Sequence, residues 1–544
     1  MPDRRTAFLG GKVWTAGYGA PRELDVLIAD GRVVRVARRG ELDAAGDRLV
    51  DITGRLLLPG FQDAHVHPAL AGTDLLTCDL SGQTNAKGIL DRIRSYAATL
   101  ADDAWVVGGG WDRGLFPYPG PTRQQLDAVT AGRPAFLRSY DCHGAWVNSA
   151  ALRIAGVDAQ TADPRNGFFV RDLSGTPTGM LEEHAMAILR AFLPPDTTED
   201  QKRALMRAHD HLLALGVTWV QDAIVGGGLA MPDQIPAYLD LLTNRSWQCR
   251  LTAALWWDPA RGTEQISDLR AKRQELEACA AQPWIIADTV KIMVDGAHTL
   301  FLDREAIREA TVALDAVGFT CHYHSYGELA TKWILDAIAE ARRLNAAGPG
   351  RHHIAHLMVI SEADFPRFAQ LDVTANIQAA WGYSAVAHEI MRRTTESGDP
   401  QLREYAFGRL AAAGARLAAG SDWPVTTADP LDAIRLEVTR GRDRKPAGAE
   451  GDPDELDRLD LPTLLTAYTA GSAYVNGREF STGRIAPGFL ADLAILDRDP
   501  FEDDEALARV VVDQTWVQGE CVYGERDHEL SRVQGVEDTR WGWC

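Results

Sequence analysis

The sequence predicts an α/β protein: a (β/α)8 TIM barrel with a small β-sandwich built from both chain ends and an inserted α+β domain after the first barrel strand. Three observations support this fold class. In the middle of the chain, apolar strand-like runs alternate with amphipathic helical stretches, which is the pattern of a parallel sheet. Both ends contain short alternating runs joined by turn residues. One connection, of about 150 residues, is far longer than a crossover requires.

Eight apolar runs are the candidate barrel strands, and eight is the number that such a barrel contains. Every gap between them except the first fits a helix and its loops, so residues 59–75 and 205–479 are assigned to the barrel. In chain order, the candidate strands are Leu56–His65, Val217–Asp222, Arg250–Trp256, Thr289–Val294, Gly318–His324, His353–His356, Asp372–Gln378 and Ala415–Asp422.

The two ends of the chain have the pattern of β-structure. Near the start, Val26–Val36 contains two alternating runs joined at Asp30-Gly31, which is a strong hairpin signal. Near the end, Ala491–Leu496 is one strand and Thr515–Tyr523 is a second hairpin. These segments predict short antiparallel sheets at both ends.

Three further domain assignments follow. Because chain termini often lie close together, residues 1–58 and 480–527 are expected to form one split β-sandwich. Residues 76–204, rich in Gly, Trp and Pro, are interpreted as an inserted domain that hangs like a lid over the barrel mouth. The charged residues 528–544 are assigned to a tail.

The composition argues against several classes of protein. Lys plus Arg is 56 and Asp plus Glu is 76, which gives a formal charge of −20. So acidic a chain repels phosphate backbones and anionic lipid, and we expect no nucleic-acid and no membrane partner. The seven cysteines are scattered and lack a C-x-x-C pair, which argues against a disulfide framework. With no secretory signal visible, we expect a cytoplasmic protein with a small-molecule substrate, and a homodimer is left open.

The sharpest local feature is the pair His65 and His67 at the end of the first candidate strand. Side chains two residues apart in a strand point to the same face. At the carboxyl end of a barrel strand, that face points into the mouth where active sites lie. Two imidazoles in this position predict one half of a metal site.

The ends of other strands offer matching residues. Lys291 stands inside an otherwise apolar strand, either paired with a buried acid or held neutral so that its amine can add CO₂ and bridge two metals. His324, His356 and Asp422 end the fifth, sixth and eighth strands. The sequence therefore predicts that these side chains converge with the first histidine pair.

This set of residues resembles the metal-dependent amidohydrolase superfamily, and more narrowly its YtcJ-like branch, which includes N-substituted formamide deformylases. The resemblance covers nearly the whole chain. It is carried by PGFQDAHVH (59–67), GWD (110–112), PGPT (119–122), DCHGAWVNSAAL (141–152), RDLSGTPTGMLEE (171–183), KIMVDG (291–296), HSYGELA (324–330), GSDWPV (420–425) and GRIAPGFLADLAILDRDP (483–500).

The resemblance implies a role for each matching residue. The implied metal ligands are His65, His67, Lys291, His324, His356 and Asp422. It also implies Zn²⁺, two ions bridged by a carboxylated Lys291 in the fuller form, with a single metal as the alternative. Asp422 would be both ligand and proton shuttle, so Asp422 and Lys291 are the expected catalytic residues.

The chain departs from the usual pattern of the branch at two positions. Glu328 stands where a His-x-x-Gly-Asp motif would place an aspartate, and His298 follows Asp295-Gly296 where small residues are common. We interpret Glu328 as a neighbour of the ligands and His298 as a candidate for specificity. The other candidate substrate-binding residues are Trp111, His143 and Trp423.

Two arginines and three histidines have two interpretations each. Arg138 and Arg113 could orient a substrate carboxylate or form salt bridges. His322, His352 and His353 stand beside the implied ligands and are interpreted as supporting or surface residues.

The predicted function is hydrolysis of a carbon–nitrogen amide bond, in an N-acyl or N-formyl amide. A metal-activated hydroxide would attack, and Asp422 would carry a proton from the water to the leaving nitrogen. One alternative is an aminohydrolase (deaminase) acting on a small cyclic or heteroaromatic substrate, but such enzymes usually have His-x-x-Glu after strand five. The other is a catalytically inactive scaffold, which would be expected to have lost ligands.

Overall fold

The computed structural model describes residues 5–117, 120–228, 231–278, 284–296, 300–345, 350–383, 401–439 and 457–524. The strands in these ranges form an eight-stranded sheet, a six-stranded sheet, a five-stranded sheet, a four-stranded sheet and a two-stranded ribbon. His298 and the tail 528–544 lie outside the described residues.

The eight-stranded sheet is a nearly closed parallel barrel, which confirms the predicted barrel. Its order is β22-β20-β18-β17-β16-β15-β14-β7. The two end strands meet at their carboxyl ends, where the amide of Asp422 donates to the carbonyl oxygen of His65 at 2.7 Å. The strands are β7 (Phe61–Val66), β14 (Val217–Val225), β15 (Arg250–Trp256), β16 (Ile285–Met293), β17 (Thr320–Ser325), β18 (His353–His356), β20 (Thr374–Ile377) and β22 (Arg416–Ala419).

The first predicted strand, Leu56–His65, is two strands in the structure. β6 (Leu56–Pro59) pairs in the five-stranded sheet, and β7 belongs to the barrel. Gly60 stands between them, and a Cβ at this position would lie 2.3 Å from Cγ2 of Thr218. The missing side chain therefore lets the backbone pass close to β14 as it changes sheets.

Helices cover the barrel, and buried apolar side chains fill the layer between helices and strands. Capping explains where they begin: at α6, Thr197 and Asp200 exchange side-chain and backbone hydrogen bonds in a capping box. The helices of this part of the chain are α1 (Pro68–Leu76), α6 (Thr198–Ala214), α7 (Ile235–Thr243), α8 (Ile266–Ala278), α9 (Arg304–Ala316), α10 (Glu328–Leu344), α11 (Phe365–Gln370), α13 (Phe407–Ala412), α14 (Pro430–Thr439), α15 (Leu461–Thr466) and α16 (Ser472–Val475).

The two ends of the chain contribute to two small sheets that share one core. The sheet orders are β4-β3-β1-β5 and β2-β6-β23-β24-β25, and the expected hairpin turns at Asp30 and Gly31, both with positive φ. Phe8, Leu57 and Trp516 are fully buried in the common core. The elements are β1 (Thr6–Leu9), β2 (Lys12–Val13), β3 (Leu24–Ala29), β4 (Arg32–Arg38), β5 (Arg48–Asp51), β23 (Leu493–Leu496), α17 (Asp504–Arg509), β24 (Val512–Val517) and β25 (Glu520–Tyr523).

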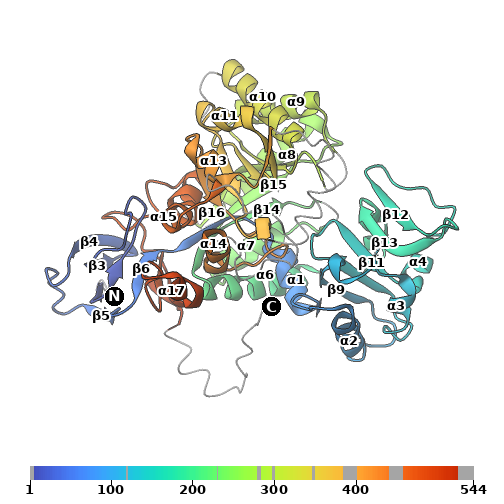
Figure 1. The fold of residues 1–544 in the computed structure, drawn as a ribbon, viewed down its shortest axis with the longest axis horizontal. Helices are drawn as coiled ribbons and strands as arrows, with labels where there is room; N and C mark the ends of the chain where they lie inside the picture. Colours follow the sequence, from blue (N-terminus) through green and yellow to red (C-terminus); the bar gives the residue numbers. More distant parts are fainter. Residues whose placement is uncertain are drawn as a thin grey trace.

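The segment after α1 forms a six-stranded mixed sheet of order β12-β13-β11-β10-β9-β8. Figure 1 shows it on the opposite flank of the barrel from β3, β4 and β5. Its elements are β8 (Cys78–Asp79), α2 (Ala86–Ala97), β9 (Val106–Trp111), α3 (Arg123–Asp127), β10 (Ala135–Ser139), β11 (Gly144–Val147), α4 (Ser149–Ala155), β12 (Gly167–Arg171), β13 (Pro177–Glu183) and α5 (Ala185–Arg190).

A ribbon of β19 (Val359–Ser361) and β21 (Leu402–Glu404) completes the described strands. Among the described residues, none of the helices combines the length and the apolar character needed to span a membrane.

Candidate metal centre

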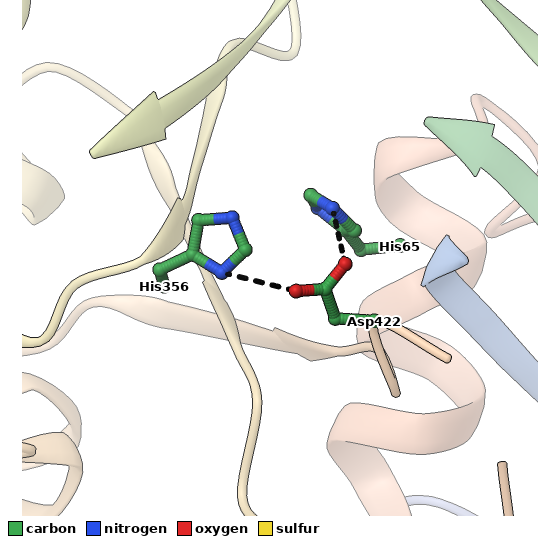
Figure 2. A group of neighbouring side chains, drawn as sticks. All are labelled: His65, His356 and Asp422. Atoms are coloured by element: carbon green, nitrogen blue, oxygen red, sulfur yellow. Dashed lines mark ion pairs between the residues drawn. The ribbon is translucent and has the colours of Figure 1, made fainter. Parts of the chain in front are cut away.

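Three histidines meet the carboxylate of Asp422 at the carboxyl ends of the barrel strands. Oδ1 of Asp422 lies 3.2 Å from Nε2 of His65 and 3.1 Å from Nε2 of His67, while Oδ2 lies 3.8 Å from Nδ1 of His356. Figure 2 shows His65 and His356 on either side of this carboxylate. Ligand atoms of His65, His356 and Asp422 all lie within 4.8 Å of one another, which is close enough for one ion to contact all three.

Lys291 projects from β16 into the same group. Its side chain is buried, and Nζ lies 3.5 Å from Nε2 of His65. In the described part of the chain Lys291 forms no ion pair with a carboxylate, although Asp422 interacts with its charge. Burial lowers the pKa of Lys291 to about 7, although Asp422 opposes the shift. The amine is therefore partly neutral at neutral pH.

His324, on β17, is oriented by a carboxylate. Its Nδ1 lies 3.1 Å from Oδ1 of Asp295. The backbone amide of Tyr326 also donates to Oδ1 of Asp295, and the amide of Gly327 donates to Oδ2. Hydrogen bonding at Nδ1 leaves Nε2 of His324 for a ligand. The ring of His324 lies 4.4 Å from that of His356, measured between centroids.

A buried chain of polar groups supports His65 from behind. Nε2 of His322 lies 2.9 Å from Nδ1 of His65, and Nε2 of Gln221 lies 2.9 Å from Nδ1 of His322 and 3.1 Å from Nε2 of His353. His322 and His353 are thus supporting residues inside the barrel, not surface residues. Contacts of this kind fix the ring orientation of a metal-binding histidine.

The donor set fits a divalent ion. Both ring nitrogens of His356 and Nδ1 of His67 are buried without a hydrogen-bond partner. Buried polar atoms are rarely left in this state, because each loses its hydration without compensation. Imidazole nitrogens and carboxylate oxygens suit Zn²⁺ and similar ions.

The site opens into a cavity of about 770 Å³. All six implied ligands line it, together with residues of the inserted segment and of the loop after β14. His143 belongs to this lining: its Nδ1 lies 3.0 Å from Oε1 of Glu183, and its Nε2 lies 2.8 Å from the hydroxyl of Tyr326. The inserted segment therefore supplies part of the cavity wall.

Four residues that line this cavity have strained backbone conformations. His356, Asp422, Glu183 and Cys142 all line it and have φ values of 75°, 56°, 51° and 61°. Non-glycine residues rarely adopt positive φ, at a cost of about 1–3 kcal/mol each. Such strain is typical of sites where side-chain placement matters more than local stability.

The structure does not bring all the expected residues to the cavity. Trp111 is fully buried in the core of the inserted sheet, where Nε1 donates to the carbonyl oxygen of Leu137 at 2.9 Å. Trp423 packs on the ring of His211 with the centroids 4.9 Å apart, and it accepts from the amide of His67 through its backbone oxygen. Neither ring is part of the lining, because each points into a packed layer.

Other expected residues have structural positions. Glu328 is the first residue of α10, half-buried and outside the lining. Arg113 forms salt bridges with Asp141 and Glu182 at 3.1 and 2.6 Å, while Arg138 does line the cavity. His352 is bonded to Asp315 beneath the barrel strands.

Several residues at the site were not singled out from the sequence. Asp63 accepts from the amides of His65 and Ser421, which joins the first and last barrel strands directly below the ligands. Burial raises the pKa of Asp63 to about 7, despite these hydrogen bonds. Asp63 and Glu183 both stand in motifs that carried the resemblance, so the signal was present although their contacts were not predictable.

The barrel, with histidines, lysine and aspartate at its strand ends, defines the architecture of a hydrolase that uses a metal. The amidohydrolase family matches residues 48–523. The chain is 28% identical over 524 residues to the N-substituted formamide deformylase of Arthrobacter pascens, covering 92% of this chain and 94% of that protein. It is 27% identical over 498 residues to YtcJ of Bacillus subtilis (strain 168), with 87% and 90% covered.

A solved structure has the same fold. An uncharacterized metal-dependent hydrolase from Pyrococcus horikoshii OT3 aligns with a TM-score of 0.69 and 22% identity, covering 92% of this chain and 99% of that one. The chain belongs to the amidohydrolase family, within the YtcJ-like branch.

Proposed function

We propose that this protein hydrolyses the carbon–nitrogen bond of an N-acyl or N-formyl amide. The observation that carries the proposal is the convergence of His65, His67 and His356 on Asp422, with Lys291 beside them, in the lining of one cavity. The similarity to a formamide deformylase supports the choice of bond.

The residues would hold Zn²⁺, two ions in the fuller form, with Lys291 carboxylated as the bridge. The partly neutral amine of Lys291 supports this, since only a neutral amine adds CO₂. When bound, the metal lowers the pKa of water from roughly 15.7 to about 7 and polarises the substrate carbonyl.

Asp422 is the proposed proton shuttle. Burial by itself would raise the pKa of Asp422, but the hydrogen bond to His67 and the interactions with His356 and Lys291 hold it below the ordinary value. Asp422 is therefore ionised at neutral pH and ready to take a proton from the attacking water. Delivery of this proton to the leaving nitrogen would let the amine depart uncharged.

Tyr326 is the proposed donor to the substrate carbonyl. Its ring lies 4.2 Å from that of His324 between centroids, and its hydroxyl is held by His143. The contact with His143 fixes the direction of the hydroxyl, and a fixed donor stabilises an oxyanion better than a mobile one does.

Residues 76–204 are the proposed cover of the site, and the two sheets of the chain ends the proposed sandwich. His143 and Glu183 support the first assignment, because both reach the cavity from the inserted segment. A cover that excludes water would strengthen the electrostatic interactions beneath it.

The test is metal analysis combined with a substrate panel. The protein loaded with Zn²⁺ should contain two equivalents and release carboxylic acid from N-formyl, N-acyl-amino-acid or cyclic amides. One equivalent of metal, with ammonia released from an aminated heterocycle and no amide cleaved, would instead identify a deaminase. A protein that binds no divalent metal would identify an inactive scaffold.

A further inference from the structure

Two arginines stand on the wall that the inserted segment contributes to the cavity. Arg138 belongs to β10, and Arg190 is the last residue of α5. Both line the same cavity as the ligands. No role in the chemistry proposed above uses either of them.

The two guanidinium groups are removed from water to a large extent, yet few carboxylates lie near enough to neutralise them. Arg138 is ion-paired with Asp74, and its Nε is buried without a hydrogen-bond partner. The carboxylate nearest to Arg190 among its ion pairs is that of Asp196, 3.8 Å away, which is beyond hydrogen-bond distance. Burial lowers the pKa of Arg190, and the positive charge of Arg138 lowers it further. Partly buried cations in this arrangement are stabilised by an added anion.

The arginine pair lies within reach of the metal centre. Arg138, Arg190 and Cys142 line the same cavity as the six implied ligands. A molecule that fills a cavity of about 770 Å³ can therefore contact both places.

We propose that Arg138 and Arg190 bind a carboxylate of the substrate, so that the substrates are amides bearing a carboxylate, such as N-acyl or N-formyl amino acids. This inference rests on the proposed amide hydrolysis. Arginine suits the role because its planar fork binds a carboxylate with two parallel hydrogen bonds. The local pair would also offset the repulsion of an anionic substrate by a chain with net charge −20.

Two achiral substrate pairs test the proposal: N-benzoylglycine and N-formylglycine, each against its carboxamide. With the zinc-loaded protein, kcat/KM should be at least about tenfold higher for each carboxylate, because charged hydrogen bonds are worth about that factor or more. Arg190→Gln should raise KM for the carboxylates by about tenfold and leave the carboxamides unchanged. Arg153→Gln, at an exposed position on α4, is the matched control and should change neither.

Equal kcat/KM for acid and carboxamide, or an Arg190→Gln variant that slows both alike, would overturn the carboxylate site while leaving amide hydrolysis in place. If no amide is cleaved, the proposed function fails, and calorimetric binding of the same compounds still decides the inference. N-Benzoylglycine should then bind at least about tenfold more tightly than its carboxamide, and Arg190→Gln should remove the difference. Equal affinities, or no binding of the acid, would refute the carboxylate site.

Discussion

The backbone amide of Asp422 donates to the carbonyl oxygen of His65 at 2.7 Å, and the side chains of the same two residues face each other with Oδ1 3.2 Å from Nε2. The first contact joins the ends of β22 and β7, the two end strands of the barrel sheet. The second forms the centre of the candidate metal site. The same two residues thus join the end strands of the barrel and bring two of the implied ligands together.

Replacing Asp422 by asparagine should separate metal binding from turnover. The amide keeps one oxygen that can act as a ligand, but it cannot accept the proton of the attacking water. We expect much of the metal to be retained and kcat to fall by about 10²–10⁴-fold. Metal content and steady-state rates measure the two effects on one preparation. An Asp422→Asn enzyme with near-normal kcat would contradict the proton shuttle.

Metal affinity should depend on His322, which contacts a ligand without being one. His322 is bonded to Nδ1 of His65, so His322→Ala should free that ring and weaken metal binding by about 10–100-fold. His65→Ala should lose the metal altogether. Competition with a chelator gives the affinities.

The control for this experiment is His352→Ala. His352 is equally buried but bonded to Asp315, so its loss should lower stability and leave metal affinity unchanged. Equal losses of affinity in His322→Ala and His352→Ala would mean that the effect is general destabilisation and not orientation of His65.

The barrel and the converging ligands could be predicted from the sequence because both follow from local patterns. A strand's period of two residues sets which face His65 and His67 share, and parallel strands bring all their carboxyl ends to one edge. No long-range information is needed to place Asp422 and His356 at that edge.

The partners of these residues could not be predicted in the same way. Trp111 follows a Gly run as a cavity residue would, yet its ring packs on Trp146 inside the inserted sheet. Glu183 and Arg190 line the cavity together with residues of the barrel, and nothing in their neighbouring residues indicates that contact. Which side chains line the cavity therefore depends on packing between segments that are distant in the sequence.

The pair His143 and Glu183 should make the free energy of unfolding depend on pH between neutral and moderately alkaline pH. Burial by itself would lower the pKa of His143, but Glu183 and Asp141 raise it to about 9, above the ordinary 6.5. A group whose pKa is raised by folding contributes its full stabilisation below the unfolded pKa and loses it as pH rises through the folded pKa. The contribution, at most roughly 3 kcal/mol, should therefore fade between pH about 6.5 and about 9.

Thermal unfolding of metal-free wild type and His143→Gln tests this expectation. The difference in Tm should be largest near pH 6 and should narrow by a few degrees toward pH 9.5. Glu183→Gln removes the partner charge and should flatten the same pH dependence. A Tm difference that is constant with pH would show that His143 is not charged by this pair.

Gly420 should not tolerate a side chain. It lies where the two end strands of the barrel sheet meet, beside the candidate metal site. A Cβ there would lie 2.5 Å from the backbone nitrogen of His65, so Gly420→Ala must push β22 away from β7. We expect a loss of about 1–3 kcal/mol in stability and a weaker metal affinity, measured by denaturant unfolding and chelator competition. Gly19→Ala, where a Cβ meets nothing within 4 Å, is the control and should change neither quantity. A Gly420→Ala protein with wild-type metal affinity would show that the ligands do not depend on the contact between His65 and Asp422.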